Sequence, residues 1–224
     1  MFIGHFAVAF AAKRAAPRTS LGALFVGAQL ADMLWPIFLL LGIEQVRIAP
    51  GSNPFLQLAF TSFPWSHSLL MEIVWGAAFG GIWYAMTKSG RGALVVALLV
   101  PSHWLLDLLV HIPDLPLYPG SDALLGFGLW RSPAATIVIE LAMFVGGVAT
   151  YARSTHALDR IGKIGVWVLA AFLLLLYIVS AVSPPPPNVK ALAWGAMVGW
   201  PLTLAPWWID RHRSANASRL LPEQ

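Results

Sequence analysis

The sequence predicts an all-α, polytopic integral membrane helix bundle of about seven spans, from its composition, its apolar segments and its loop charges. Hydrophobic residues make up 58% of the 224 residues, charged residues only 11%, and the mean hydropathy is +0.72. Because a soluble domain carries about 25% charged residues, this chain is predicted to lie in a bilayer. It has no cysteine, which excludes disulfides, thiolate metal sites and cysteine nucleophiles.

Seven apolar segments approach the length of about 20 residues that a helix needs to cross a bilayer. The first is the shortest, and whether it crosses fully is left open. It lacks the preceding positive charge of a signal peptide, so we expect a retained helix. No internal repeat is evident, and residues 1–224 are expected to form one transmembrane domain. The segments lie near residues 2–16, 20–42, 66–87, 92–111, 133–151, 164–182 and 190–209.

Basic residues are concentrated in alternate loops. Most of the 14 Lys and Arg residues follow the first, third, fifth and seventh segments. The positive-inside rule then predicts an outer N-terminus and an inner C-terminus. The same rule accounts for the net charge of +4 without a nucleic-acid partner. Of the outer loops, 43–65 is expected to carry a short interfacial helix at 53–60, and 112–132 to form an irregular lid.

A few ionisable residues interrupt the predicted spans. Ionisable side chains are costly in hydrocarbon and therefore mark candidate functional sites. The predicted orientation brings all of them into the outer half of the bilayer. They are His5, Asp32, His67, Glu72, His103, Asp107, His111 and Glu140.

The stretch PSHWLLDLLVH carries three of these residues at a spacing of four. Residues four apart share a helix face, so His103 and Asp107 can hold one cation, with His111 nearer the mouth of the site. Imidazole and carboxylate ligands suit zinc, iron or manganese. Ser66 is predicted to cap a helix whose N-terminus keeps His67 neutral. His103 with Asp107, and Asp32, have an alternative role as hydrogen-bonding partners between helices. His5 and His111 have an alternative role as interfacial residues, and His111 also as a proton shuttle. Glu72 and Glu140 are alternatives between structural pairing, support of the ligands and catalysis.

Several short motifs resemble the bacterial inner-membrane, membrane-bound metal-dependent hydrolase family, which includes LexA-regulated hydrolases. The resemblance covers about residues 1–115, the site-bearing half. Leu34 and Trp35 replace an Asp and a His of the family pattern, and Ser62 and Phe63 replace a His-Arg pair. The ligand order also resembles that of zinc-dependent phospholipase C. The matching residues are Gly4-His5, Ala31-Asp32, Ser66-His67-Ser68-Leu69-Leu70, and Ser102-His103 with Asp107.

The residues and the resemblance together imply a metal-dependent hydrolase of the inner membrane. A divalent ion, zinc before manganese or iron, would activate water against a phosphoester of a lipid or lipid-linked substrate. A spare carboxylate or Glu72 would serve as general base, and Arg131 or His111 would bind a phosphate or protonate the leaving group. The alternatives are a proton or metal-ion transporter and a protein with a structural metal. The expected metal ligands are His5, Asp32, His67, His103 and Asp107.

Overall fold

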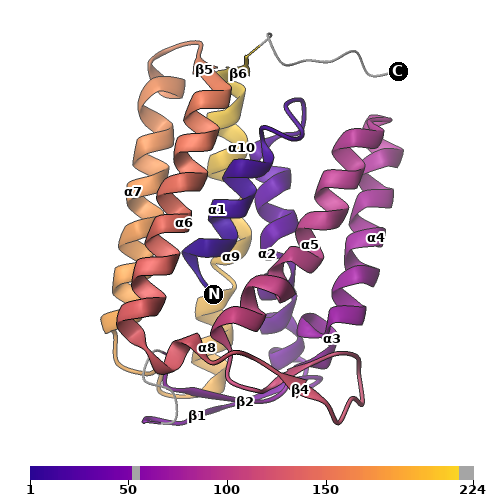
Figure 1. Ribbon diagram of the computed structural model, residues 1–224, viewed down its shortest axis with the longest axis vertical. Coiled ribbons are helices and arrows are strands. Elements are labelled where there is room, and N and C mark those ends of the chain that lie inside the picture. The colour runs from indigo at the N-terminus through magenta and orange to yellow at the C-terminus, as the bar shows by residue number, and fades with distance from the viewer. Residues whose placement is uncertain (52–55, 217–224) are drawn as a thin grey trace.

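The computed structural model describes residues 1–51 and 56–216 and is a bundle of helices roughly parallel to its long axis (Figure 1). Five described helices are long and apolar enough to cross a membrane. The predicted helical bundle is therefore confirmed, with five helices suited to crossing a membrane. The number of crossings and their orientation stay predictions. The five helices are α2 (Leu21–Leu40), α4 (Leu69–Thr87), α5 (Gly90–Val110), α6 (Pro133–Ser154) and α7 (Arg160–Val182).

The first predicted segment forms a shorter helix, α1 (Ile3–Ala12), of 10 residues. At 1.5 Å per residue it is about 15 Å long, half the thickness of a hydrocarbon core. It begins near mid-height in the bundle and runs toward the upper end (Figure 1). Its closest approach is to α6, where a Cβ at Gly147 would lie 2.3 Å from the Ala7 carbonyl oxygen. The surrounding helices thus bury α1 and place its N-terminal end inside the bundle.

The last predicted segment, 190–209, is broken into three short helices, α8 (Val189–Ala196), α9 (Gly199–Leu202) and α10 (Leu204–Arg211). They follow one another along the length of the bundle (Figure 1). The interruptions coincide with glycine and proline, which disfavour a continuous helix. Together these pieces cover α2, which packs against α8 and α10.

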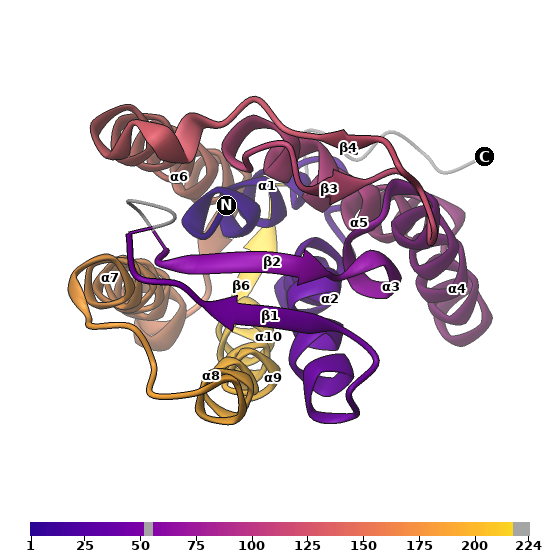
Figure 2. The ribbon, with the colours of Figure 1, turned by 90° about the horizontal axis from the view of Figure 1, so that it is seen from below.

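The lower end of the bundle carries the loops predicted to lie outside (Figure 2). Loop 43–65 forms a hairpin of β1 (Gln45–Ile48) and β2 (Leu58–Ser62), with Val46 opposite Phe60, followed by the short α3 (Pro64–His67). The expected helix at 53–60 is wrong for residues 58–60, which pair as a strand, and 53–55 lie outside the described residues. Loop 112–132 contains β3 (Leu115–Pro116), β4 (Leu124–Leu125) and the 3₁₀ helix η1 (Leu129–Arg131).

A buried ionic cluster closes the upper end, beside the strand pair β5 (Thr155–Ala157) and β6 (Arg213–Ala215). Lys13 Nζ donates to Asp210 Oδ2 at 2.5 Å and to the Thr19 carbonyl. The Tyr151 hydroxyl donates to the other Asp210 oxygen at 2.8 Å. The cluster therefore fastens the end of α1 to α6 and α10. Below it lies a packed aromatic layer of Phe6, Phe10, Phe25 and Phe144.

Candidate metal centre

Six side chains predicted from the sequence meet between α1, α2, α3 and α5. All except Asp32 are at least nine-tenths buried, and Asp32 has 41% of its side chain exposed. Pro101 lies inside α5, two residues before His103. The six are His5 on α1, Asp32 on α2, His67 at the end of α3, His103 and Asp107 on α5, and His111 at the C-cap of α5.

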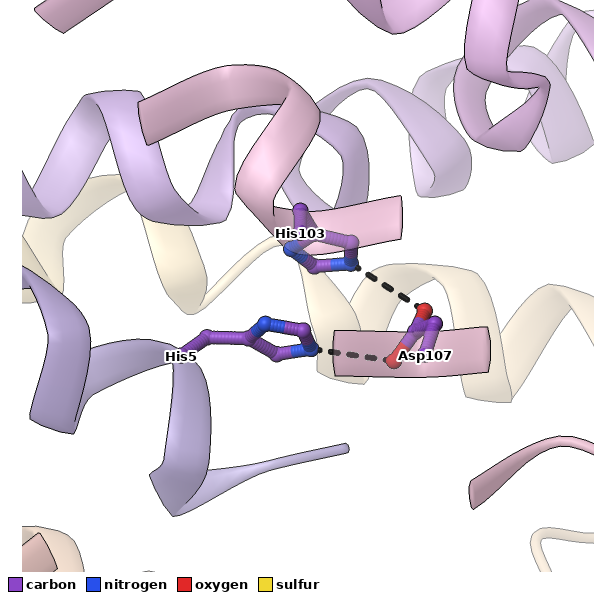
Figure 3. A group of neighbouring side chains, drawn as sticks. All are labelled: His5, His103 and Asp107. Atoms are coloured by element: carbon purple, nitrogen blue, oxygen red, sulfur yellow. Dashed lines mark hydrogen bonds and ion pairs between the residues drawn. The ribbon is translucent and has the colours of Figure 1, made fainter. Parts of the chain in front are cut away.

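Five of these residues form two overlapping groups whose ligand atoms are close enough together to hold a metal ion. One comprises His5, His103 and Asp107, and the other comprises Asp32, His67 and His103; within each, the ligand atoms lie within 4.8 Å of one another. The two rings of the first group approach different oxygens of Asp107, at 3.1 Å from His5 Nε2 and 3.4 Å from His103 Nε2 (Figure 3). In tetrahedral zinc, ligand atoms about 2.0–2.1 Å from the ion are about 3.4 Å apart. The spacing therefore suits a small divalent ion.

The Nδ1 atoms of three histidines are already engaged as donors. His103 Nδ1 lies 2.8 Å from the Ala28 carbonyl oxygen, which can only accept a hydrogen bond. His111 Nδ1 lies 2.8 Å from Asp114 Oδ1. His67 Nδ1 lies 2.7 Å from Ser66 Oγ. The Ser66 hydroxyl itself donates to Glu44 Oε2 at 2.7 Å, so the ring must be the donor. When these rings are neutral, each Nε2 consequently carries no hydrogen and has a lone pair free to accept a hydrogen bond or bind a metal ion.

All three Nε2 atoms face one carboxylate oxygen, Asp107 Oδ2. The separations are 3.4 Å from His103, 3.5 Å from His111 and 4.0 Å from His67. Among the described residues, the buried His103 Nε2 has no hydrogen-bonding partner. Lone pairs that face a carboxylate repel it unless a cation or added protons lie between them. A divalent ion bound by these atoms satisfies all of them together.

A positive charge already lies at the edge of this cluster. The α-amino group of Met1 contacts Asp107 Oδ1 as an ion pair. Oδ1 also faces His5, whereas Oδ2 faces the other three histidines. The two oxygens of Asp107 therefore serve different sides of the site.

Three buried glutamates hold the backbone beside the histidines. Each accepts a hydrogen bond from the amide of a residue adjacent to one ring, which fixes the backbone from which that ring projects. Such second-layer contacts orient metal ligands. Glu140 accepts from Gly4 beside His5 at 3.2 Å, Glu44 from Ser66 beside His67 at 2.8 Å, and Glu72 from Trp104 beside His103 at 3.0 Å.

Some predicted roles change with these positions. Glu72 is completely buried and does not line the cavity described below. Arg131 is exposed in η1 and is likewise not among the described residues that line it. The prediction of Ser66 as a helix N-cap is wrong, because Ser68 caps α4 by accepting from the Met71 amide. His67 instead ends α3 and directly precedes the Ser68 cap of α4.

A cavity of about 430 Å³ adjoins the centre. His67, Asp107 and His111 border it, together with the partly exposed Asp32. Beyond these polar groups the wall is mainly apolar and extends to α7, α8 and α9. The centre is therefore accessible from a large apolar space.

The described residues add two site members that the sequence did not single out. Asp114 fixes the His111 ring, and its spacing of three from His111 was the available signal. Glu44 reaches His67 through Ser66, and no local spacing indicates that contact.

Comparison with known proteins gave no match to any family model, curated protein or solved structure. The site is thus interpreted from its own chemistry.

Proposed function

We propose that this membrane protein is a metal-dependent hydrolase whose site lies in the outer half of a bacterial inner membrane. The observation that carries the proposal is the set of three Nε2 atoms around Asp107 Oδ2, with each Nδ1 engaged elsewhere. Nitrogen and carboxylate ligands favour zinc, with manganese or iron as substitutes.

The position of Asp32 supports hydrolysis rather than a sealed structural metal. Its Oδ1 lies 3.4 Å from His67 Nε2 and 3.8 Å from His103 Nε2, and its side chain borders the cavity. A bound divalent ion lowers the pKa of its water to about 7. Asp32 is placed to orient that water or take its proton. Glu72 lies behind His103 and supports the ligand backbone, so we assign the base to Asp32.

The substrate we propose is a phosphoester of a lipid or lipid-linked molecule. When His111 Nε2 carries a proton rather than a metal ion, it can donate that proton to a leaving group at the polar end of the cavity. His67 and His103 then supply the nitrogen ligands. Arg131 is exposed near this end and can attract an anionic headgroup without lining the cavity. The apolar wall excludes a large, fully hydrated substrate.

Transport of protons or metal ions is a weaker candidate. A transport path requires polar groups that continue through the bundle. Here Phe6, Phe10 and Phe25 pack between the centre and the Lys13–Asp210 cluster. This aromatic layer favours a site that opens toward one side of the membrane.

We also propose that the end of the bundle with β1 and β2 faces the outside and that the end with most of the basic residues faces the inside. The seven predicted segments are kept, and α1 enters only part of the bilayer.

Metal analysis of the detergent-purified protein tests the proposal. We expect bound zinc in the wild type and none in His103→Ala, because His103 belongs to both ligand groups. His156→Ala is the matched control, since His156 is exposed on β5. Turnover of bis(4-nitrophenyl) phosphate and of phosphatidic acid should disappear with chelator and return with zinc. Full metal retention by folded His103→Ala protein would refute the assignment of the metal site. Turnover that does not depend on metal would refute a metal-dependent mechanism.

A further inference from the structure

The cavity beside the metal centre has one polar end and one apolar end. The polar end holds His111, Asp107 and Asp32, and the apolar end is bounded by α7, α8 and α9. Its volume of about 430 Å³ falls in the range of small-molecule sites, roughly 300–1,000 Å³. A molecule that fits both ends must itself be amphiphilic.

Two tryptophans that line the cavity have indole N–H groups without an acceptor among the described residues. The indole Nε1 atoms of Trp35 and Trp130 are buried without an acceptor among the described residues. Both tryptophans line the cavity and are at least nine-tenths buried. Phe60 packs against both rings, and Trp130 lies 4.1 Å from His111 between ring centroids. Unsatisfied buried donors are costly, and anionic oxygens are suitable acceptors.

The apolar end opens sideways through the bundle. Val179 and Ser180 on α7 both line the cavity and are exposed, as are Gly195 and Val198 on the opposite side. Helix α7 packs on α10 but makes at most a weak contact with α8 and α9. From below, α7 and α8 stand apart at the rim of the bundle (Figure 2).

The surface around this opening is strongly apolar. Leu175, Ile178 and Val182 are exposed on α7, and Trp194 and Trp200 are exposed on the other side. In a membrane bundle, such a face contacts lipid hydrocarbon. The opening therefore connects the metal centre with the bilayer interior rather than with water.

We propose that the cavity binds an anionic phospholipid that enters sideways between α7 and α8–α9, with its phosphate at Trp35 and Trp130 and its hydrocarbon chain along the apolar wall. This inference rests on the proposed function for the fate of the headgroup, but the binding step needs no chemistry. It assigns Trp35 and Trp130 as donors to phosphate oxygens, and the small residues Gly195 and Gly199 as the side of the opening that admits the chain.

Glycine substitutions at the opening provide a sharp test. A Cβ at Gly199 would meet only Met33 Cγ at 3.8 Å, and one at Gly195 would meet nothing within 4 Å. A Cβ atom therefore fits at both positions, and Gly199→Phe and Gly195→Phe are the variants designed to narrow the opening. Gly146→Phe is the matched control, because Gly146 is an exposed helical glycine of α6 with open space around its Cβ and no place in the cavity wall.

Equilibrium binding of labelled dioleoyl phosphatidic acid, dihexanoyl phosphatidic acid and inorganic phosphate should be measured at constant nonionic detergent. In the wild type, the dioleoyl lipid should bind at least about tenfold more tightly than the dihexanoyl lipid, because longer chains bury more methylenes. Gly199→Phe and Gly195→Phe should remove that advantage and leave dihexanoyl binding unchanged. Trp130→Phe should weaken both lipids by about fivefold, the size of one lost hydrogen bond.

Three results would overturn the inference: equal affinity for both chain lengths, equal affinity for phosphate and lipid, or the same loss in Gly146→Phe as in the opening variants. A circular-dichroism melt checks that each variant is folded. The titrations are repeated with chelator and with zinc. Chain-length preference that persists in metal-free protein supports lipid entry even if hydrolysis is absent, so failure of one proposal is separable from failure of the other.

Discussion

The imidazole rings of His5 and His103 are stacked, with centroids 3.6 Å apart and planes inclined by 4° (Figure 3). They come from α1 and α5, and each faces a different oxygen of Asp107. Two protonated rings at this separation would repel each other strongly. The stack therefore disfavours simultaneous protonation of both rings. A cation shared with the Asp107 carboxylate would take the place of a second proton. Only His103 also belongs to the group that contains Asp32 and His67.

This asymmetry predicts graded metal loss. His5→Ala leaves His67, His103 and Asp107 in place, so we expect zinc binding that is weakened but still measurable. His103→Ala removes a ligand from both groups and should abolish binding. Competition against a zinc-sensitive fluorophore measures both constants. Indistinguishable affinities for the two variants would show that the two groups do not share His103 in this way.

Glu44 is predicted to act on the metal through Ser66 and His67. Its carboxylate accepts from the Trp65 and Ser66 amides and from the Ser66 hydroxyl. Glu44→Ala should lower zinc affinity by about 10–100-fold, as loss of an outer-layer partner does. Glu44→Gln should recover part of it, because an amide oxygen still accepts from the backbone. Gln45→Ala, at an exposed neighbour, is the control, and unchanged zinc affinity in Glu44→Ala would contradict this role.

Close contact between α4 and α5 predicts a difference between two glycines of one helix. A Cβ at Gly76 would lie 2.4 Å from the Ala97 carbonyl oxygen, whereas one at Gly81 would meet nothing within 4 Å. Gly76→Ala should cost about 1–3 kcal/mol by forcing the helices apart. Gly81→Ala should gain about 0.5–1 kcal/mol from helix propensity. Thermal melts in detergent measure the pair, and a Tm for Gly76→Ala at or above that of Gly81→Ala would be incompatible with this packing.

Asp159 predicts an acid-dependent contribution to stability at the upper end of the bundle, beside β5 and β6. The backbone N–H of Gly162, and then His212, hold the pKa of Asp159 below its ordinary value. A carboxyl whose folded pKa is lowered contributes fully above the unfolded value of about 3.9, and the contribution is lost as the pH falls through the folded value. Asp159→Asn keeps an oxygen for the Gly162 N–H but removes the charge. The Tm difference between Asp159→Asn and the wild type should therefore shrink as the pH falls from about 6 to about 3. A difference that stays constant over this range would exclude the Asp159 charge as its cause.

Much of the centre was predictable because its residues occur at helical spacing in unusually apolar segments. The recurrence of His103, Asp107 and His111 at every fourth position put them on one face of α5. Depth inferred from loop charge correctly brought His5, Asp32 and His67 toward the same place. The alternation of apolar segments and polar loops likewise predicted the five long helices.

Other features depend on tertiary contacts that local patterns do not encode. Glu44 lies in a loop, and only the fold of the β1–β2 hairpin brings it to Ser66. Hydropathy also does not distinguish a helix surrounded by lipid from one surrounded by protein, so the ten-residue α1 resembled a short span. The break in 190–209 had a local signal in Gly199 and Pro201, which apolar composition outweighed.

The capping of α1 by Glu140 has a consequence for the order in which the centre forms during synthesis. Glu140 accepts the Gly4 amide across 136 residues of sequence. At about 5–20 residues per second, the ribosome adds the residue that holds the His5 backbone roughly 7–27 s after that backbone is made. The backbone beside His5 therefore lacks this acceptor while α2 to α5 are made, and it gains the acceptor only once α6 has been made. A translation pause before α6 would prolong that interval.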